Sequence, residues 1–215
     1  MMARHAPASG RAAIGLVLVH GRGASAASIL DLARAVALPD LVAVAPEAPG
    51  LSWWPTSFLA PMAQMQEPLE AALEAMDAAV AGLEAEGLPR DRIALAGFSQ
   101  GACLALEFAV RRGQGLHSVT SFSGGLIGTA DASAAGDPAL QGFAPKRFDY
   151  RTPLAGMPVH LSVHEQDPHI PMLRVRETAV VLDRLGAQVT SRIIPGAGHG
   201  LDQASVAALQ ARLRG

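Results

Sequence analysis

The 215-residue chain has a single cysteine, few aromatic residues (4%) and no long run of charge of one sign. One cysteine excludes an internal disulfide and a zinc site built from cysteines. Lys and Arg total 17 and Asp and Glu total 19, so the net charge of −2 makes nucleic acid and anionic membranes poor partners. No apolar run approaches the roughly 18 residues of a membrane-spanning helix, so stable membrane insertion is not expected.

Hydrophobic residues are abundant, at 50% of the total, and they are accompanied by 22 glycines and 15 prolines. This composition can fill a core and supplies many turns, which excludes a disordered chain. Because a domain averages roughly 150 residues, we expect residues 1–215 to form a single α/β domain.

The N-terminal region has some features of a secretory signal. Arg4 and Arg11 precede the apolar run 12–19, and the small residues 24–26 resemble a cleavage site. His20 and Arg22 interrupt the region before that site, and cleavage would remove a predicted core strand. We therefore expect a cytoplasmic protein.

Apolar runs alternate with helical patterns along most of the chain. The runs that predict strands are 14–19, 41–45, 93–98, 119–122, 159–163 and 189–194. The patterns that predict helices are 28–37, 67–85, 100–112, 171–186 and 204–213. This alternation is typical of a mostly parallel sheet with helices on both faces. Apolar and polar residues alternate in 159–163, so we expect one face of that strand to be less buried.

Three segments show neither pattern. Residues 1–10 predict a loose N-terminal arm or a short edge element, and residues 46–61 predict an irregular loop. Residues 124–153 form a loop-rich excursion of a length that is usually functional or partly disordered. Small molecules bind beyond the carboxyl ends of parallel strands, so the residues after each strand are the candidates for chemistry.

A G-x-S-x-G segment, GFSQG at 97–101, lies between the predicted strand 93–98 and the predicted helix 100–112. A sharp strand-to-helix turn strains the backbone of Ser99 and needs small neighbours, which Gly97 and Gly101 provide. Such a turn projects the serine hydroxyl above the sheet. Ser99 is therefore the predicted nucleophile, and the alternative is a glycine-rich helix start with a serine cap.

A serine hydroxyl needs a base, and His199 is the one histidine that follows the last predicted strand in a glycine-rich loop. The base needs an orienting acid, which in this kind of site lies between the serine and the histidine along the chain. Asp167 follows the predicted strand 159–163, whereas most other acids in this interval lie in predicted helices or in 124–153. Asp167 is the predicted acid, and Glu165 is its close rival.

An oxyanion hole is the remaining requirement, because charge develops on the carbonyl oxygen during acyl transfer. The backbone N–H of Gln100, directly after the nucleophile, is the first predicted donor. The loop HGRG at 20–23 follows an earlier strand, and the backbone N–H of Arg22 is the second. We also place His20 and Gly21 at the substrate, with His20 bracing the loop and Gly21 allowing close approach of the backbone.

The segments HGRG at 20–23, GFSQGA at 97–102, DPHIP at 167–171 and GH at 198–199 together resemble the phospholipase/carboxylesterase family. SWWP at 52–55 and FLAP at 58–61 resemble a bacterial branch of it, so the likeness extends from about residue 14 to the end. The resemblance implies a minimal α/β-hydrolase fold without a large cap domain. Related thioesterases carry Leu where Arg22 stands, and dienelactone hydrolases use a cysteine where Ser99 stands.

The resemblance further implies hydrolysis of a small-molecule ester with a short-to-medium acyl chain, through an acyl-enzyme intermediate. It implies no metal and no organic cofactor. Trp54 and Phe58 are expected either to form an apolar wall at the substrate or to pack in the core. The Arg22 side chain either attracts an anionic substrate group or is solvated. A homodimer is left open.

Several alternative functions are consistent with the same sequence. A thioesterase, a lysophospholipase or a cofactor-free perhydrolase would share the triad, and a non-catalytic ligand-binding protein would use the fold alone. Cys103 is expected to pack in the core rather than to react. His160, His164 and His169 are not expected to bind metal, because no carboxylate pattern completes a site.

Overall fold

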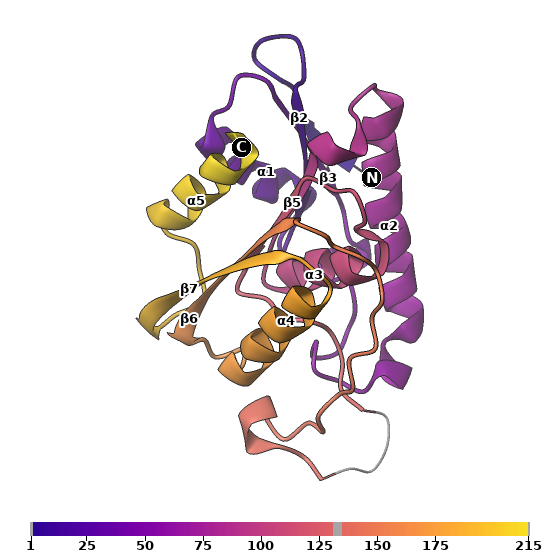
Figure 1. The fold of residues 1–215 in the computed structure, drawn as a ribbon, viewed down its shortest axis with the longest axis vertical. Helices are drawn as coiled ribbons and strands as arrows, with labels where there is room; N and C mark the ends of the chain where they lie inside the picture. The colour runs from indigo at the N-terminus through magenta and orange to yellow at the C-terminus, as the bar shows by residue number, and fades with distance from the viewer. Residues whose placement is uncertain (1, 131–134, 215) are drawn as a thin grey trace.

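The computed structural model describes residues 2–130 and 135–214 and contains one seven-stranded sheet (Figure 1). Its strand order is β1-β3-β2-β4-β5-β6-β7, and every neighbouring pair is parallel except β1 with β3. The strands are β1 Met2–His5, β2 Ile14–Val19, β3 Leu41–Pro46, β4 Ile93–Phe98, β5 Ser118–Phe122, β6 Pro158–Gln166 and β7 Gln188–Ala197.

In the described residues, five α-helices and four short 3₁₀ helices accompany the strands. The α-helices are α1 Ala26–Val36, α2 Gln66–Ala85, α3 Gln100–Arg112, α4 Met172–Arg184 and α5 Gln203–Arg214. The 3₁₀ helices are η1 Pro49–Leu51, η2 Met62–Gln64, η3 Arg90–Arg92 and η4 Pro138–Leu140. None of the helices in the described residues combines the length and apolar character of a membrane span.

The helices cover both faces of the sheet, as the alternating pattern predicts. Leu16 and Leu18 of β2 pack in one apolar layer with α1 and α5, whereas Val17 and Val19 pack in the other with α2, α3 and α4. All six residues of β2 are buried, as expected for a strand that is covered on both faces. The predicted α/β-hydrolase architecture, a mostly parallel sheet between two helical layers, is confirmed.

Of the two predicted forms of the N-terminal segment, a loose arm or a short edge element, the structure shows the edge element. Met2–His5 form the edge strand β1, which pairs antiparallel with β3 in the register Met2 to Pro46 through His5 to Ala43. Arg4 also donates two hydrogen bonds of 2.6 Å to the carboxylate of Glu86. The backbone ladder thus holds a segment whose polar composition carries no strand signal.

The excursion 124–153 contains no strand and only η4 among its described residues, yet its first part is buried. The N–H of Leu126 donates to Thr178 Oγ1 at 3.0 Å, and that of Ile127 donates to Glu107 Oε2 at 3.1 Å. Residues 124–129 therefore belong to the packed interior. Asp131, one of the aspartates of this segment, lies outside the described residues, as do 132–134.

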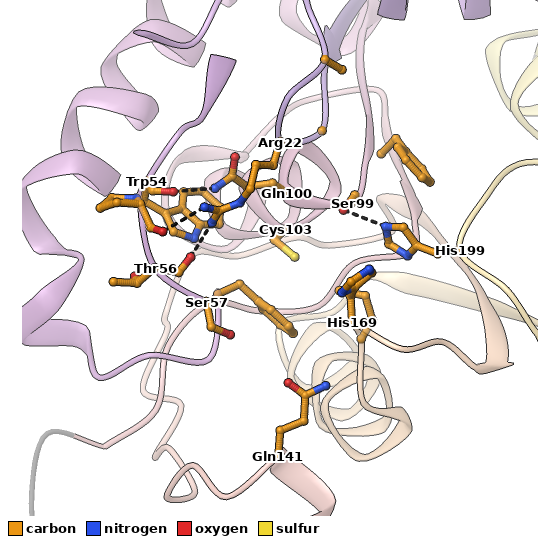
Figure 2. A pocket seen from close by; sticks show the side chains of 16 residues that line it. Arg22, Trp54, Thr56, Ser57, Ser99, Gln100, Cys103, Gln141, His169 and His199 are labelled. Carbon is orange, nitrogen blue, oxygen red and sulfur yellow. Dashed lines mark hydrogen bonds between the residues drawn. The ribbon is translucent and has the colours of Figure 1, made fainter. Parts of the chain in front are cut away.

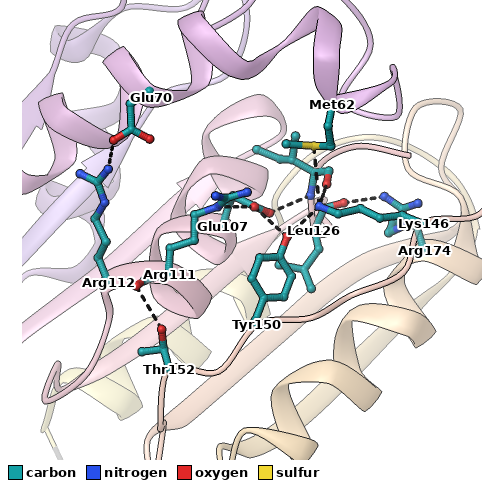
Figure 3. A network of polar contacts seen from close by, with 11 residues as sticks. Met62, Glu70, Glu107, Arg111, Arg112, Leu126, Lys146, Tyr150, Thr152 and Arg174 are labelled. Carbon is teal, nitrogen blue, oxygen red and sulfur yellow. Dashed lines mark hydrogen bonds and ion pairs between the residues drawn. The ribbon is translucent and has the colours of Figure 1, made fainter. Parts of the chain in front are cut away.

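A polar network ties the later part of the excursion to α3 and α4 (Figure 3). Glu107 is fully buried and accepts hydrogen bonds from Tyr150 Oη at 2.7 Å and Arg111 Nε at 2.6 Å. Lys146 Nζ donates to Tyr150 Oη at 2.9 Å and to the carbonyl of Ile127 at 2.8 Å. Buried charges are tolerated only when they are paired in this way, so the network anchors an otherwise irregular segment.

The prediction that one face of β6 is less buried is wrong. His160 and Ser162 are only 5% and 4% exposed, because α5 and β7 cover that face. His160 Nδ1 lies 3.1 Å from Arg212 Nη2 of α5 and 3.0 Å from Thr190 Oγ1 of β7. Burial, with the charges of Arg212 and Arg192, lowers the pKa of His160 to about 4.

This environment predicts a pH-dependent stability. The unfolded chain protonates His160 near the ordinary histidine pKa of 6.5, whereas the folded chain resists protonation down to a pKa of about 4. The unfolded state therefore binds more protons in that window, and stability falls as the pH falls. We expect the free energy of unfolding to drop by about 1–2 kcal/mol more in wild type than in His160→Asn between about pH 7 and pH 5. Urea titrations at both pH values measure the free energy of unfolding. Equal decreases in wild type and His160→Asn would contradict the prediction.

Candidate active site

Ser99 lies at the turn between β4 and α3, with φ of 55° and ψ of −120°. This is a strained conformation for a residue with a side chain, of a kind that clusters at functional sites. A Cβ at Gly97 would come within 2.3 Å of the Gly101 carbonyl oxygen, and one at Gly101 within 2.1 Å of the Val19 oxygen. The two glycines are thus required by close approach of backbone, as the motif predicts. The Ser99 N–H donates to the Phe122 carbonyl at 2.9 Å and helps to hold the turn.

The three residues predicted as nucleophile, base and acid lie in one hydrogen-bonded chain. His199 Nε2 is 2.9 Å from Ser99 Oγ (Figure 2). His199 Nδ1 is 2.9 Å from Asp167 Oδ2 and 3.0 Å from Oδ1. A carboxylate can only accept, so Nδ1 carries the proton and Nε2 accepts from the serine hydroxyl. The geometry is that of a serine made nucleophilic by a base.

The Asp167 side chain is fully buried, and its acceptor capacity is used. Oδ1 accepts the backbone N–H groups of His169 at 2.9 Å and Ile170 at 3.1 Å, besides the imidazole. Burial raises the pKa of Asp167, but the hydrogen bonds from His199 and the His169 N–H outweigh it and hold the pKa below its ordinary value. Glu165, the rival acid, is exposed. Asp167 therefore stays ionised at neutral pH and orients His199.

The loop 20–23 lies against the nucleophile. A Cβ at Gly21 would stand 3.3 Å from the Cβ of Ser99, and both Arg22 and Gln100 line the cavity beside Ser99. Gln100 opens α3, where backbone N–H groups have no carbonyl partner within the helix. The structure thus brings the two residues predicted as oxyanion donors to the same cavity as the serine.

The cavity has a volume of about 520 Å³. Of the residues predicted at the substrate, Gly21, Trp54 and Phe58 line it. Trp54 and Phe58 are only 1% and 8% exposed, so they serve both as packing and as wall. The size is within the range of ordinary ligand pockets, roughly 300–1,000 Å³.

His20 is a correction to the predicted substrate contacts. The side chain of His20 is fully buried, and His20 is not among the described residues that line the cavity. Its Nε2 accepts the N–H of Ala48 at 3.1 Å, so Nδ1 carries the proton and donates to the Gly21 carbonyl at 2.8 Å. His20 therefore braces the loop through these hydrogen bonds and does not line the substrate cavity.

The Arg22 side chain is exposed, and it also binds a neighbouring segment of the chain. Its Nη1 donates to the carbonyl of Pro55 at 2.9 Å and its Nη2 donates to the carbonyl of Thr56 at 2.5 Å. The exposed guanidinium is therefore fixed to that segment, and its attraction of an anionic substrate group stays a prediction.

Four polar residues of the lining were absent from the predicted site: Thr56, Ser57, Gln141 and His169. His169 lies in the DPHIP segment, and its ring meets that of His199 edge-on with centroids 4.8 Å apart. Gln141 comes from the excursion 124–153, and its Nε2 donates to the carbonyl of Pro168 at 3.3 Å. The position of His169 two residues after Asp167 could have pointed to it, whereas Gln141 has no local signal.

No metal cluster accompanies the site in the described part of the chain. Within residues 2–130 and 135–214, no group of three or more His, Cys, Asp or Glu side chains is placed to share an ion.

Sheet order, strained serine turn and hydrogen-bonded side chains define an α/β-hydrolase. The family model described as phospholipase/carboxylesterase matches residues 5–214, and the chain belongs to that family. It is an ester hydrolase of the carboxylesterase type.

Solved structures agree with this assignment. A phospholipase/carboxylesterase from Dyadobacter fermentans is 33% identical, with 100% of this chain and 96% of that chain covered and a TM-score of 0.85. The esterase PE8 is 27% identical, with 99% and 96% covered and a TM-score of 0.76. A carboxylesterase from Bacillus cereus, at 17% identity with 99% and 92% covered, shares the fold with a TM-score of 0.73.

The burial of Cys103 predicts an unreactive thiol, although the residue lines the cavity. It is 1% exposed, and burial, opposed by a hydrogen bond from the Gly125 N–H, raises its pKa to about 12. We expect the native protein to react with Ellman's reagent about 10³-fold more slowly than the denatured chain. Since this is the one cysteine, the assay needs no mutant, and equal rates in the two states would contradict the prediction.

Proposed function

We propose that Ser99, His199 and Asp167 form the catalytic triad of an esterase that cleaves short-to-medium acyl esters through an acyl-enzyme. The observation that carries the proposal is the continuous hydrogen-bonded chain from Ser99 Oγ to the Asp167 carboxylate, at a strained turn beside a cavity. Each member occupies the position that its role in acyl transfer requires.

In the first step His199 Nε2 accepts the proton of Ser99 as Oγ attacks the ester carbonyl. Asp167 stabilises the imidazolium that forms and keeps its ring oriented. The developing oxyanion is held by the backbone N–H groups of Arg22 and Gln100. His199 then protonates the leaving alcohol, which departs and leaves the acyl group on Ser99.

In the second step the same groups act on water. His199 accepts a proton from a water molecule as its oxygen attacks the acyl-enzyme carbonyl. The tetrahedral species collapses, Ser99 recovers its proton from His199, and the carboxylic acid leaves. The chemistry needs no metal or organic cofactor.

The directions of the leaving group and the acyl chain follow from the positions of these groups. The leaving oxygen has to lie at His199 Nε2, because that nitrogen protonates it. Trp54 and Thr56 lie on one side of Ser99, and His199 and His169 lie on the other (Figure 2). The acyl chain therefore extends toward Trp54 and Thr56, and the alcohol leaves past His169.

The test is steady-state hydrolysis of p-nitrophenyl acetate, butyrate and octanoate by wild type and three variants. Ser99→Ala should reduce turnover to the uncatalysed background, and Asp167→Asn should lower kcat by about 10⁴-fold, because an amide favours the wrong imidazole tautomer. Glu165→Gln is the matched control, since it neutralises an exposed carboxylate two residues away, and it should behave as wild type.

Circular dichroism of each variant shows whether the fold is kept. Wild-type turnover in a folded Ser99→Ala variant would show that another residue is the nucleophile. A large loss in Glu165→Gln with little loss in Asp167→Asn would assign the acid to Glu165.

A further inference from the structure

The wall segment, residues 52–58, borders the cavity without being part of a helix or strand. Trp53, Trp54 and Phe58 in it are nevertheless buried, at 4%, 1% and 8% exposure. Pro55 and Ser57 are exposed, so the requirement for protein partners of the N–H and carbonyl groups applies to the buried positions of the segment. Its hydrogen-bond partners therefore decide how firmly this side of the cavity is held.

The side chain of Gln100 supplies the first set of partners. Its Oε1 accepts the N–H of Trp53 at 3.0 Å, and its Nε2 donates to the carbonyl of Trp54 at 2.9 Å. Gln100 is only 6% exposed, so these bonds are shielded from water. The residue that follows the proposed nucleophile thus holds the start of the wall segment with its amide.

The side chain of Arg22 supplies the second set. Its guanidinium donates to the consecutive carbonyls of Pro55 at 2.9 Å and Thr56 at 2.5 Å. A planar fork of donors suits two adjacent acceptors, which the ammonium of lysine cannot match. Arg22 belongs to none of the ion pairs within residues 2–130 and 135–214, so its charge serves these carbonyls.

A backbone contact just before the wall segment and a side-chain contact from within it connect the same two parts of the chain. The N–H of Gly23 donates to the carbonyl of Leu51 at 2.8 Å, and Trp53 Nε1 donates to the carbonyl of His20 at 2.9 Å. The loop 20–23 and the wall segment therefore lie against each other along their length. Both residues proposed as oxyanion donors bind the wall segment with their side chains (Figure 2).

We propose that Arg22 is a positioning residue that selects the acyl chain by clamping the wall segment, and that it does not bind a substrate anion. The inference rests on the proposed function, which places the acyl chain against this wall. With the clamp in place, a long acyl chain meets a fixed surface that is tied to the oxyanion donors. Without it, the carbonyls of Pro55 and Thr56 turn to water, and the long chain loses more contact than acetate does.

The kinetic test uses Arg22→Met, which keeps the aliphatic stem, and Arg22→Lys, which keeps the charge but loses the fork. Arg34→Met is the matched control, since Arg34 is an exposed arginine on α1 that pairs with Asp31. The substrates are p-nitrophenyl acetate, butyrate and octanoate, and the mono-p-nitrophenyl ester of succinic acid, which carries a carboxylate.

We expect the octanoate-to-acetate ratio of kcat/KM to fall about tenfold in both Arg22 variants, the factor that corresponds to one lost hydrogen bond from a charged donor. The losses on the butyrate and succinate esters should be equal, and Arg34→Met should keep the wild-type ratio. An unchanged ratio in Arg22→Met would overturn the clamp. A loss confined to the succinate ester, restored by lysine, would make Arg22 an anion-binding residue instead.

Hydrogen exchange provides a readout that needs no turnover. In Arg22→Met the amides of the buried residues Trp53, Trp54 and Phe58 should exchange faster than in wild type, while those of α4 keep their rates. Unchanged exchange in the wall segment would overturn the clamp whatever the kinetics show. Loss of protection together with activity that survives Ser99→Ala would retain the clamp and reject the proposed catalytic residues.

Discussion

The arrangement of the site depends on the contact between the start of α3 and the ends of β2 and β4. Gly101 lies so close to the backbone of Val19 that any side chain would displace one of the two. This approach brings Ser99 above the sheet edge and next to the loop 20–23. Ser99 has a positive φ at this turn, and the hydrogen bond from its N–H to the Phe122 carbonyl offsets part of the strain. Every other functional contact is built around this turn.

The residues around the turn form two groups, one on each side of Ser99, with different proposed roles. On one side, β6 and the segment after β7 bring Asp167 and His199 together, and the buried carboxylate sets the imidazole tautomer. On the other side, Arg22 and Gln100 join the proposed oxyanion donors to the wall segment. In the proposed mechanism, proton transfer and acyl-chain contact are carried by different parts of the chain, so substitutions should separate them.

Much of this could be predicted from the sequence because the signals are local. Buried parallel strands are continuous apolar runs, and their ends show where Ser99, Asp167 and His199 stand. The covered face of β6 could not be predicted, since α5 supplies the cover from some 45 residues away. For residues 1–10 the sequence left a loose arm and a short edge element open, and only the pairing of Met2–His5 with β3 decides between them. The contacts of the Arg22 side chain could not be predicted either, because they join two irregular segments 33 residues apart.

The most direct measurement is of the covalent intermediate on Ser99. Rapid acid quench of the enzyme during hydrolysis of p-nitrophenyl octanoate, followed by peptide mass spectrometry, identifies the acylated residue. The account predicts an octanoyl adduct on Ser99, present in wild type and absent in Ser99→Ala. An adduct on another residue, or turnover with no adduct at any quench time under conditions where acylation is fast, would contradict it.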